Sequence, residues 1–264
     1  MKIIDIHTHA FPDSIAERAM ESLNEGVDAK AKLDGRISSL LASMDAANVD
    51  ISIVASIATR PKQYAPILEW SKTIASERLI PFPSVHPSDP EAAAKIRHIA
   101  SEGFLGIKLH PYYQEFDLLD DRMFPIYEAV LDSNLALLMH TGFDPAFKRN
   151  RIADPVRISE VSRMYPSLKL ITTHTGAWED WDEVRRYLIG KPVYMDLSYS
   201  VEFMEPGFAR SLLEAHPAEY LLLGTDSPWS DPRDTITYLR NLQMGHDWEA
   251  LVLGGNAMRL LNLS

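Results

Sequence analysis

Short apolar segments alternate with helix-forming segments along the whole chain, and this alternation is the feature that most limits the possible folds. Eight segments are almost continuously apolar, and a stretch with helical character follows each of them. Strands that alternate with helices and lack a polar face are typical of parallel strands buried on both sides. The predicted strands are Ile3–His9, Ile51–Ile57, Leu79–Val85, Gly106–His110, Leu135–His140, Leu168–His174, Val193–Leu197 and Tyr220–Thr225.

Eight such units favour a closed barrel over an open sheet. A (β/α)8 TIM barrel has about 250 residues, which is close to the 264 residues of this chain. No Gly-x-Gly-x-x-Gly turn follows the first strand, which removes the usual dinucleotide-binding alternative. We therefore predict an α/β fold of the (β/α)8 TIM-barrel type, with residues 1–264 forming a single domain.

A long excursion at residues 11–35 separates the first strand from the next regular helix. It is polar and contains glycine and lysine, with a predicted helix at Ser14–Leu23. Loops longer than about 12–15 residues often close over binding sites. We therefore expect residues 11–35 to form a lid insertion beside the end of the first strand.

Composition limits the partners and the compartment. The formal charge of −11 argues against nucleic acid, because such binding depends on neutralising phosphates. No apolar run approaches the roughly 20 residues of a membrane helix, and no signal peptide is visible. The absence of cysteine rules out disulfides, thiolate catalysis and cysteine-ligated zinc. We expect a cytoplasmic protein that acts on a small molecule, with a homodimer left open.

Ionisable side chains stand at the carboxyl ends of the predicted strands, where barrel enzymes keep their chemistry. His7 and His9 are two residues apart on one strand, so both imidazoles point to the same side. Neutral imidazole is a common metal ligand. The other side chains that converge on this mouth predict a metal site together with the two histidines: Lys108, His110, His140, His174 and Asp226.

Several motifs resemble the amidohydrolase superfamily, in particular its amidohydrolase-related (amidohydrolase 2) branch. They are DIHTHAFPD, GIKLHP, HTG in two places, GTDSPW and the terminal NAMRLLNL. The branch includes aminocarboxymuconate semialdehyde decarboxylase, resorcylate-type decarboxylases and a lactone hydrolase that acts on pyrone dicarboxylate. The resemblance covers the whole chain and implies a TIM barrel of the metal-dependent hydrolase type.

The resemblance implies that His7, His9, His140 and Asp226 bind one divalent metal ion, zinc in the first place or manganese. It makes His174 the residue that orients or deprotonates the reacting water, with Asp226 as a second catalytic residue. Three neutral imidazoles and one carboxylate leave a divalent ion with about one net positive charge and an open position. Such an ion acidifies water and polarises a carbonyl, and a neutral histidine suits proton transfer near neutral pH.

Lys108 and His110 share one face of the fourth strand and allow two interpretations. In binuclear members of the superfamily, a lysine at the corresponding strand is carboxylated and bridges two metals. Alternatively, Lys108 lies deeper in the barrel and pairs with Asp5, Asp196 or Asp226. His110 then supports the ligands or faces the substrate. We favour one metal ion, with a second metal as the alternative.

Basic and aromatic residues after the strand ends are candidates for substrate binding. The loop after the fifth strand carries Arg149 and Arg151, which could hold a substrate carboxylate, and Lys148 is their neighbour. Aromatic side chains that could form walls for a planar substrate follow other strand ends: Tyr112, Tyr113, Trp178 and Trp229. The remaining histidines outside the strand ends are expected at the surface: His98, His216 and His246.

Two reactions fit this predicted site. A metal-dependent hydrolase would use activated water on an amide, ester or lactone bond of a small, carboxylate-bearing molecule. A non-oxidative, metal-dependent decarboxylase would act instead on a small unsaturated or aromatic acid. The chain is shorter than expected for such decarboxylases, so hydrolysis is the preferred prediction.

Overall fold

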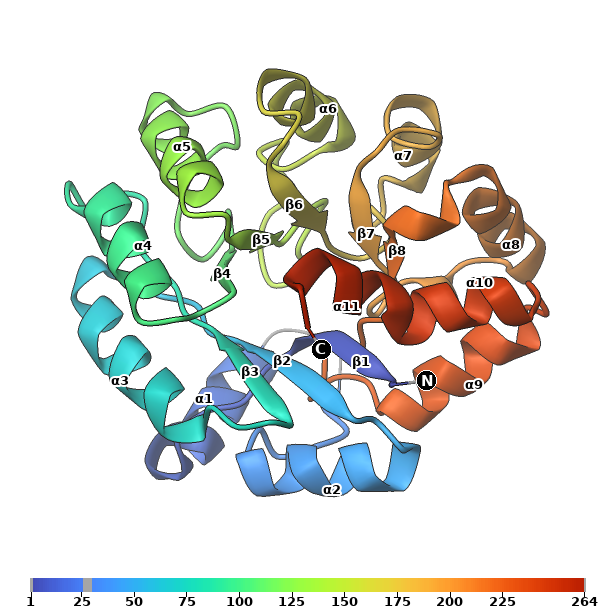
Figure 1. Ribbon diagram of the computed structural model, residues 1–264, viewed down its shortest axis with the longest axis horizontal. Helices are drawn as coiled ribbons and strands as arrows, with labels where there is room; N and C mark the ends of the chain where they lie inside the picture. Colours follow the sequence, from blue (N-terminus) through green and yellow to red (C-terminus); the bar gives the residue numbers. More distant parts are fainter. Residues whose placement is uncertain (1, 26–29, 264) are drawn as a thin grey trace.

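Among the residues that the computed structural model describes, eight parallel strands stand at the centre and helices surround them (Figure 1). The structure describes residues 2–25 and 30–263. The strands are β1 (Ile4–Thr8), β2 (Ile51–Ala55), β3 (Leu79–Phe82), β4 (Gly106–Leu109), β5 (Ala136–Met139), β6 (Lys169–Thr172), β7 (Tyr194–Asp196) and β8 (Leu221–Leu222).

Backbone hydrogen bonds close the strands into a barrel. Regular ladders join β1 to β3 and β4 to β8 in sequence order. At one seam the Lys108 amide donates to Pro83 O at 2.9 Å, and at the other the Ile6 amide donates to Leu223 O at 2.8 Å. Both seams between the two ladders are therefore bridged, and the predicted (β/α)8 barrel is confirmed.

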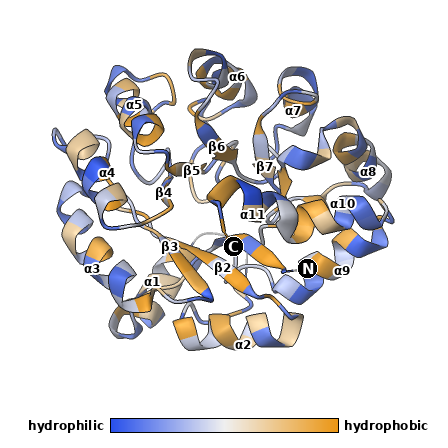
Figure 2. Ribbon diagram, in the orientation of Figure 1, coloured by the Kyte–Doolittle hydropathy of each residue, from blue (hydrophilic) through white to orange (hydrophobic). Residues whose placement is uncertain are grey.

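All the helices described except the last form the outer ring and turn their apolar faces to the strands (Figure 2). The described helices are α1 (Asp13–Asn24), α2 (Ile37–Ala47), α3 (Tyr64–Ile74), α4 (Ala92–Ser101), α5 (Phe124–Asp132), α6 (Pro155–Met164), α7 (Trp181–Tyr187), α8 (Pro206–Ala215), α9 (Pro232–Asn241), α10 (His246–Ala250) and α11 (Asn256–Leu261). No helix within residues 2–25 and 30–263 is both long enough and apolar enough to span a membrane.

The C-terminal helix α11 closes one end of the barrel (Figure 1). Its Ala257, Leu260 and Leu261 pack in one cluster with inward side chains such as Ile4 and Leu138. The turn directly before α11 also packs closely, because a Cβ atom on Gly254 would lie 2.0 Å from the carbonyl oxygen of Lys2. The other end of the barrel, at the carboxyl ends of the strands, carries the ionisable residues.

Two details differ from the sequence predictions. The ladders end before most of the ionisable residues, so His9, His110 and His174 lie just beyond the last strand bonds. His216 was expected at the surface, and this was wrong: its side chain is 3% exposed and its Nε2 lies 3.0 Å from Val193 O. Of the predicted lid at 11–35, residues 26–29 lie outside the described residues, and α1 occupies much of the remainder.

Candidate active site

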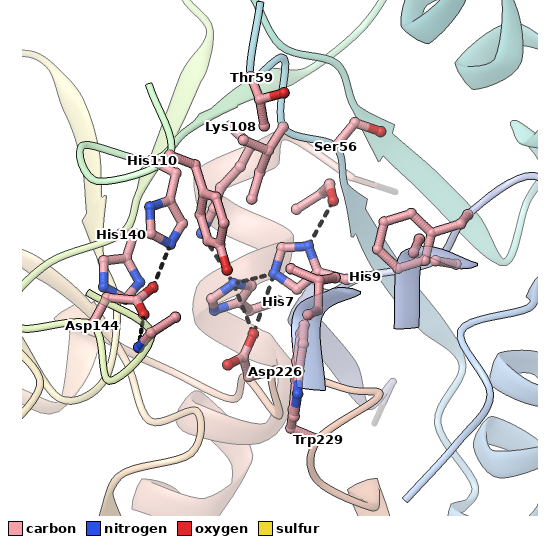
Figure 3. A pocket seen from close by; sticks show the side chains of 18 of the residues that line it. His7, His9, Ser56, Thr59, Lys108, His110, His140, Asp144, Asp226 and Trp229 are labelled. Atoms are coloured by element: carbon pink, nitrogen blue, oxygen red, sulfur yellow. Dashed lines mark hydrogen bonds and ion pairs between the residues drawn. The ribbon is translucent and has the colours of Figure 1, made fainter. Parts of the chain in front are cut away.

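A cavity of about 730 Å³ opens at the carboxyl ends of the strands. The ionisable residues predicted from the strand ends all line it, and Figure 3 shows most of them pointing toward one another. The complete set is His7, His9, Lys108, His110, His140, His174 and Asp226.

His7, His9 and Asp226 form a compact triangle of ligand-type atoms (Figure 3). His7 Nε2 lies 3.1 Å from His9 Nε2, and Asp226 Oδ1 lies 3.3 and 3.2 Å from these two nitrogens. Ligand atoms held at about 2.0–2.1 Å around a tetrahedral zinc ion are about 3.3 Å apart. The triangle therefore has the dimensions of one face of a tetrahedral metal site.

Hydrogen bonds at the other ring nitrogens turn both Nε2 atoms toward the triangle. His9 Nδ1 donates to Ala55 O at 2.8 Å, so in the neutral ring the lone pair is on Nε2. His7 Nδ1 lies 2.9 Å from Asp196 Oδ2 and 3.0 Å from Ser198 Oγ, and it donates to the carboxylate. Carboxylate–histidine pairs of this kind orient metal-ligating imidazoles in proteins.

The importance of Asp196 was missed in the sequence, where it appeared only as one partner considered for Lys108. It ends β7, so the rule that identified the other strand-end residues would also have found this one. Asp196 Oδ1 also accepts hydrogen bonds from the backbone amides of His174 and Ser198, at 3.1 and 3.0 Å. One buried carboxylate thus supports two neighbouring parts of the site.

The electrostatics of the triangle suit a cation. Burial lowers the pKa of His7 well below its usual value, and the nearby Lys108 adds to this effect. Burial acts to raise the pKa of Asp226, but His7 and His9 outweigh it and the pKa falls below its usual value. At neutral pH the ring of His7 is therefore neutral and Asp226 is ionised, which are the protonation states a metal requires.

Lys108 points to this triangle. Its Nζ lies 3.0 Å from His7 Nε2, and its side chain is fully buried. Burial lowers the pKa of Lys108 to about 8. The structure thus places Lys108 at the centre of the mouth, where its ammonium group donates to the lone pair that a metal ion would use.

His140, the fourth predicted ligand, lies in a second group with His110 and Asp144. The His110 and His140 rings stack with centroids 4.0 Å apart, and His110 Nε2 lies 3.2 Å from Asp144 Oδ2. His140 Nε2 is buried and has no hydrogen-bond partner among the described residues. Sequence reasoning missed Asp144, although it follows the HTG motif only four residues after His140.

His174 stands between the two groups of ligand-type residues. Its Nδ1 donates to Ser198 O at 3.0 Å, so its Nε2 carries a lone pair and lies 3.1 Å from His140 Nδ1. His174 and Asp226 both have left-handed backbone conformations, with φ of 59° and 60°. Non-glycine residues rarely adopt this conformation, and such residues cluster at functional sites.

The first HTG motif needs its glycine for a close backbone approach. Gly142 has φ of 84°, and a Cβ atom there would lie 2.0 Å from the amide nitrogen of Trp178. This contact joins the turn after His140 to the turn after His174. The glycine therefore holds the two histidine-bearing turns together.

Arg149 and Arg151 do not line the cavity. Arg149 pairs with Glu179 and Asp180, and Arg151 pairs with Asp154 and Glu183. Both side chains are 53% exposed. Their charges are compensated by carboxylates on the protein surface, so this structure does not bring them to the predicted substrate site.

Only some of the aromatic residues predicted to contact the substrate line the cavity. Trp178 and Trp229 line the cavity, whereas Tyr112 is buried beside it and donates its hydroxyl to Asn150 O at 2.6 Å. Its neighbour Tyr113 lines the cavity instead, with its ring 4.7 Å from that of His110. Consecutive residues after a strand face different directions, and the sequence could not show which tyrosine would face inward.

The residues present fit one divalent metal ion. The Nε2 atoms of His7 and His9 and the Oδ1 atom of Asp226 converge, and His140 adds an unpartnered buried nitrogen at the same mouth. An ion there would take the place that the Lys108 ammonium group occupies beside His7 Nε2. Nitrogen and oxygen ligands of this kind suit zinc and also manganese.

Solved structures show the same fold. The 5-carboxyvanillate decarboxylase of Sphingomonas paucimobilis is 16% identical, with a TM-score of 0.73 over 100% of this chain and 99% of the other. A probable 2-pyrone-4,6-dicarboxylic acid hydrolase from Acinetobacter baumannii is 14% identical, with a TM-score of 0.71 over 99% and 100%. The 5-carboxyvanillate decarboxylase of Novosphingobium aromaticivorans, complexed with manganese and a nitrobenzoic acid, is 18% identical, with a TM-score of 0.71 over 99% and 96%.

Comparison of the sequence with known proteins identifies a family but no individual relative. No curated protein matches the chain significantly. The family model described as amidohydrolase matches residues 4–263, which is almost the whole length. This protein therefore belongs to the amidohydrolase family.

Proposed function

We propose that this protein is a metal-dependent hydrolase that cleaves an ester, lactone or amide bond of a small molecule. The observation that carries the proposal is the triangle of His7 Nε2, His9 Nε2 and Asp226 Oδ1, with sides of 3.1–3.3 Å, next to His174. The family membership supports an enzyme, and its structural relatives include both hydrolases and decarboxylases.

The side chains divide the work between holding the ion and moving the proton. His7, His9 and Asp226 would hold the ion, and His140 would complete the set with its unpartnered nitrogen. A divalent ion in this position supplies a Lewis acid that polarises a carbonyl and acidifies water. His174 has its Nδ1 fixed on Ser198 O, so Nε2 is the atom that can accept a proton and later return it.

The lining of the cavity favours hydrolysis of an uncharged group. No arginine is found among the described residues that line it, and Lys108 is the one lysine there. An ester, lactone or amide needs no counter-charge away from the reacting carbonyl. The prediction of a carboxylate on the substrate rested on Arg149 and Arg151. Because neither arginine lines the cavity, that prediction is no longer supported.

Decarboxylation is the second candidate, and Lys108 is the observation that favours it. Its buried Nζ lies 3.0 Å from His7 Nε2, so it could bind one oxygen of a substrate carboxylate beside the ion. The substrate would then be a small unsaturated or aromatic acid whose carboxylate enters the mouth directly.

A substrate screen that records two products separates the candidates. Protein loaded with one equivalent of Zn²⁺ or Mn²⁺ would be offered esters, lactones, amides and aromatic acids, with acid release and CO₂ release followed in parallel. We expect acid release that stops when the metal is chelated and that falls in His174→Asn. CO₂ release from acids without any ester, lactone or amide cleavage would support decarboxylation, and no turnover by fully loaded protein would contradict both.

A further inference from the structure

The cavity continues away from the ligand residues into a groove between α1 and α3. Two helix faces line this extension with regular helical spacing. The lining residues are Ile15, Ala19, Ser22 and Leu23 on α1, and Pro66, Ile67 and Trp70 on α3, with Gln63 directly before α3. Spacings of three, four, seven and eight residues place each set on one side of its helix, so the two sides form the opposing walls of the groove.

The α1 wall of the groove is not the face that attaches the helix to the barrel. Ala16 and Met20 are the buried residues of α1, and a Cβ atom on Gly35 would lie 2.9 Å from Met20. Ile15 lines the groove and is 37% exposed, one of few large apolar side chains with such exposure among the described residues. Apolar surface left in water at a cavity wall is typical of a binding site.

The groove is continuous with the ligand residues through two short connections. From His9, the chain passes through the cavity-lining Phe11 and Pro12 directly into α1. From Ala55, it passes through Ser56 and Thr59 toward α3, and His9 Nδ1 is bonded to Ala55 O at 2.8 Å. A molecule whose reacting group lies at His9 would therefore meet the groove on leaving the triangle.

None of these lining residues has a charged side chain. The rise of α1 gives the length of the groove. Ile15 and Leu23 are eight residues apart, which is about 12 Å along α1 and roughly the length of an extended nine-carbon chain. The groove thus matches a long apolar group better than a compact polar one.

We propose that the groove between α1 and α3 binds a flexible apolar arm of about eight to ten carbons, carried by the ester, lactone or amide substrate. This inference rests on the proposed function, because the reacting carbonyl must lie at the triangle while the arm lies between the helices. The substrate class is then a neutral acyl compound with a long alkyl chain, and the structure assigns chain-length specificity to Ile15, Ala19, Ile67 and Trp70.

Binding of a homologous series tests the groove independently of turnover. Butyrate, hexanoate, octanoate and decanoate would be titrated by calorimetry into Zn²⁺-loaded protein and again into metal-free protein. Burial of each added methylene should lower Kd by about fourfold up to the length of the groove. The increments should persist without metal even if every Kd rises. A Kd that does not change from butyrate to decanoate would overturn the proposal.

A matched pair of variants locates the binding to the groove. Ala19→Asp places a carboxylate between the walls and should abolish the gain from butyrate to decanoate. Ala65→Asp makes the same substitution on an exposed part of α3 that does not line the cavity, and it should bind like wild type. Trp70→Ala should reduce the gain without adding charge. Thermal unfolding of all three variants checks that the barrel remains folded.

The remaining outcomes also decide the question. Equal losses in Ala19→Asp and Ala65→Asp would contradict the assignment, as would a dimer that buries the groove and dissociates in Ala19→Asp. If alkanoates bind with the expected increments but no ester, lactone or amide is cleaved, the arm site stands and the proposed hydrolysis fails. If p-nitrophenyl acetate and p-nitrophenyl octanoate are hydrolysed with equal kcat/KM, the proposed hydrolysis stands and the arm site fails.

Discussion

Two groups at the mouth of the barrel contain the same residue types, two histidines and one aspartate, and yet they are built differently. In the first group, His7 and His9 have both Nδ1 atoms bonded to acceptors outside the group, at 2.9 and 2.8 Å. In both groups an imidazole Nε2 lies 3.2–3.3 Å from the group's own carboxylate, so the groups differ at Nδ1. His110 Nδ1 is buried with no partner among the described residues.

The difference shows what distinguishes a ligand set with oriented imidazoles from one in which an imidazole has no acceptor to orient it. External acceptors fix the tautomers of the first group and turn the lone pairs of His7 and His9 toward Asp226. In the second group no acceptor among the described residues is bonded to His110 Nδ1, so nothing fixes the tautomer of His110 or turns its lone pair toward Asp144. We therefore expect the first group to bind the ion and His140 to be the one member of the second group that contributes.

The largest expected effect is on metal content. His9→Ala should purify with less than about a tenth of an equivalent of zinc or manganese after reconstitution, because two ligands cannot replace three. His110→Ala should retain about one equivalent, since the triangle is intact. Elemental analysis of both proteins provides the measurement. Loss of metal in His110→Ala alone would reverse the comparison, and two equivalents in wild type would show that both groups bind ions.

A second effect separates proton transfer from metal binding within the mouth. His174→Asn should keep most of its metal and lose about 10²–10⁴-fold in kcat, because a positioned general base is removed. Asp226→Asn should lose metal affinity as well as rate, because the anionic ligand disappears. Parallel metal titrations and rate measurements test this. If His174→Asn is metal-free and Asp226→Asn stays loaded, the two roles must be exchanged.

A smaller effect tests the external acceptors directly. Asp196→Asn should weaken metal affinity about 10–100-fold, because an amide can present its NH₂ group to His7 Nδ1 and so favour the wrong tautomer. Asp144→Asn, a matched change in the other group, should alter affinity by no more than about threefold. Competition with a fluorescent chelator measures both affinities. Similar losses in the two variants would mean that the groups do not differ as described.

The smallest effect concerns the loop that carries Asp144. Arg149→Ala and Arg151→Ala should change KM by less than about twofold, because exposed ion pairs contribute little and neither side chain lines the cavity. The KM of both variants would be measured with acids and with neutral esters. A rise in KM confined to acids would return these arginines to the substrate site and weaken the case for a neutral substrate.

The barrel could be predicted from sequence because its causes are local. Each strand is a short apolar segment followed by a helix, and eight repeats leave one compact arrangement. His7, His9 and Asp226 could be placed at one mouth for the same reason, because the carboxyl ends of parallel strands meet. The resemblance to amidohydrolases, which rests on contiguous motifs, agrees with the family match over residues 4–263.

The directions of the side chains at the mouth, and which of them pair, were decided only by the tertiary structure. Whether Tyr112 or Tyr113 faces the cavity, and whether His140 joins His9 or His110, depends on turns whose conformations involve contacts far apart in sequence. Arg149 is drawn away by Glu179 and Asp180, thirty residues later in the chain. Apolar spacing alone does not reveal whether a helix face meets the core or a cavity, so the groove between α1 and α3 emerged only when the barrel brought the two helices to face each other.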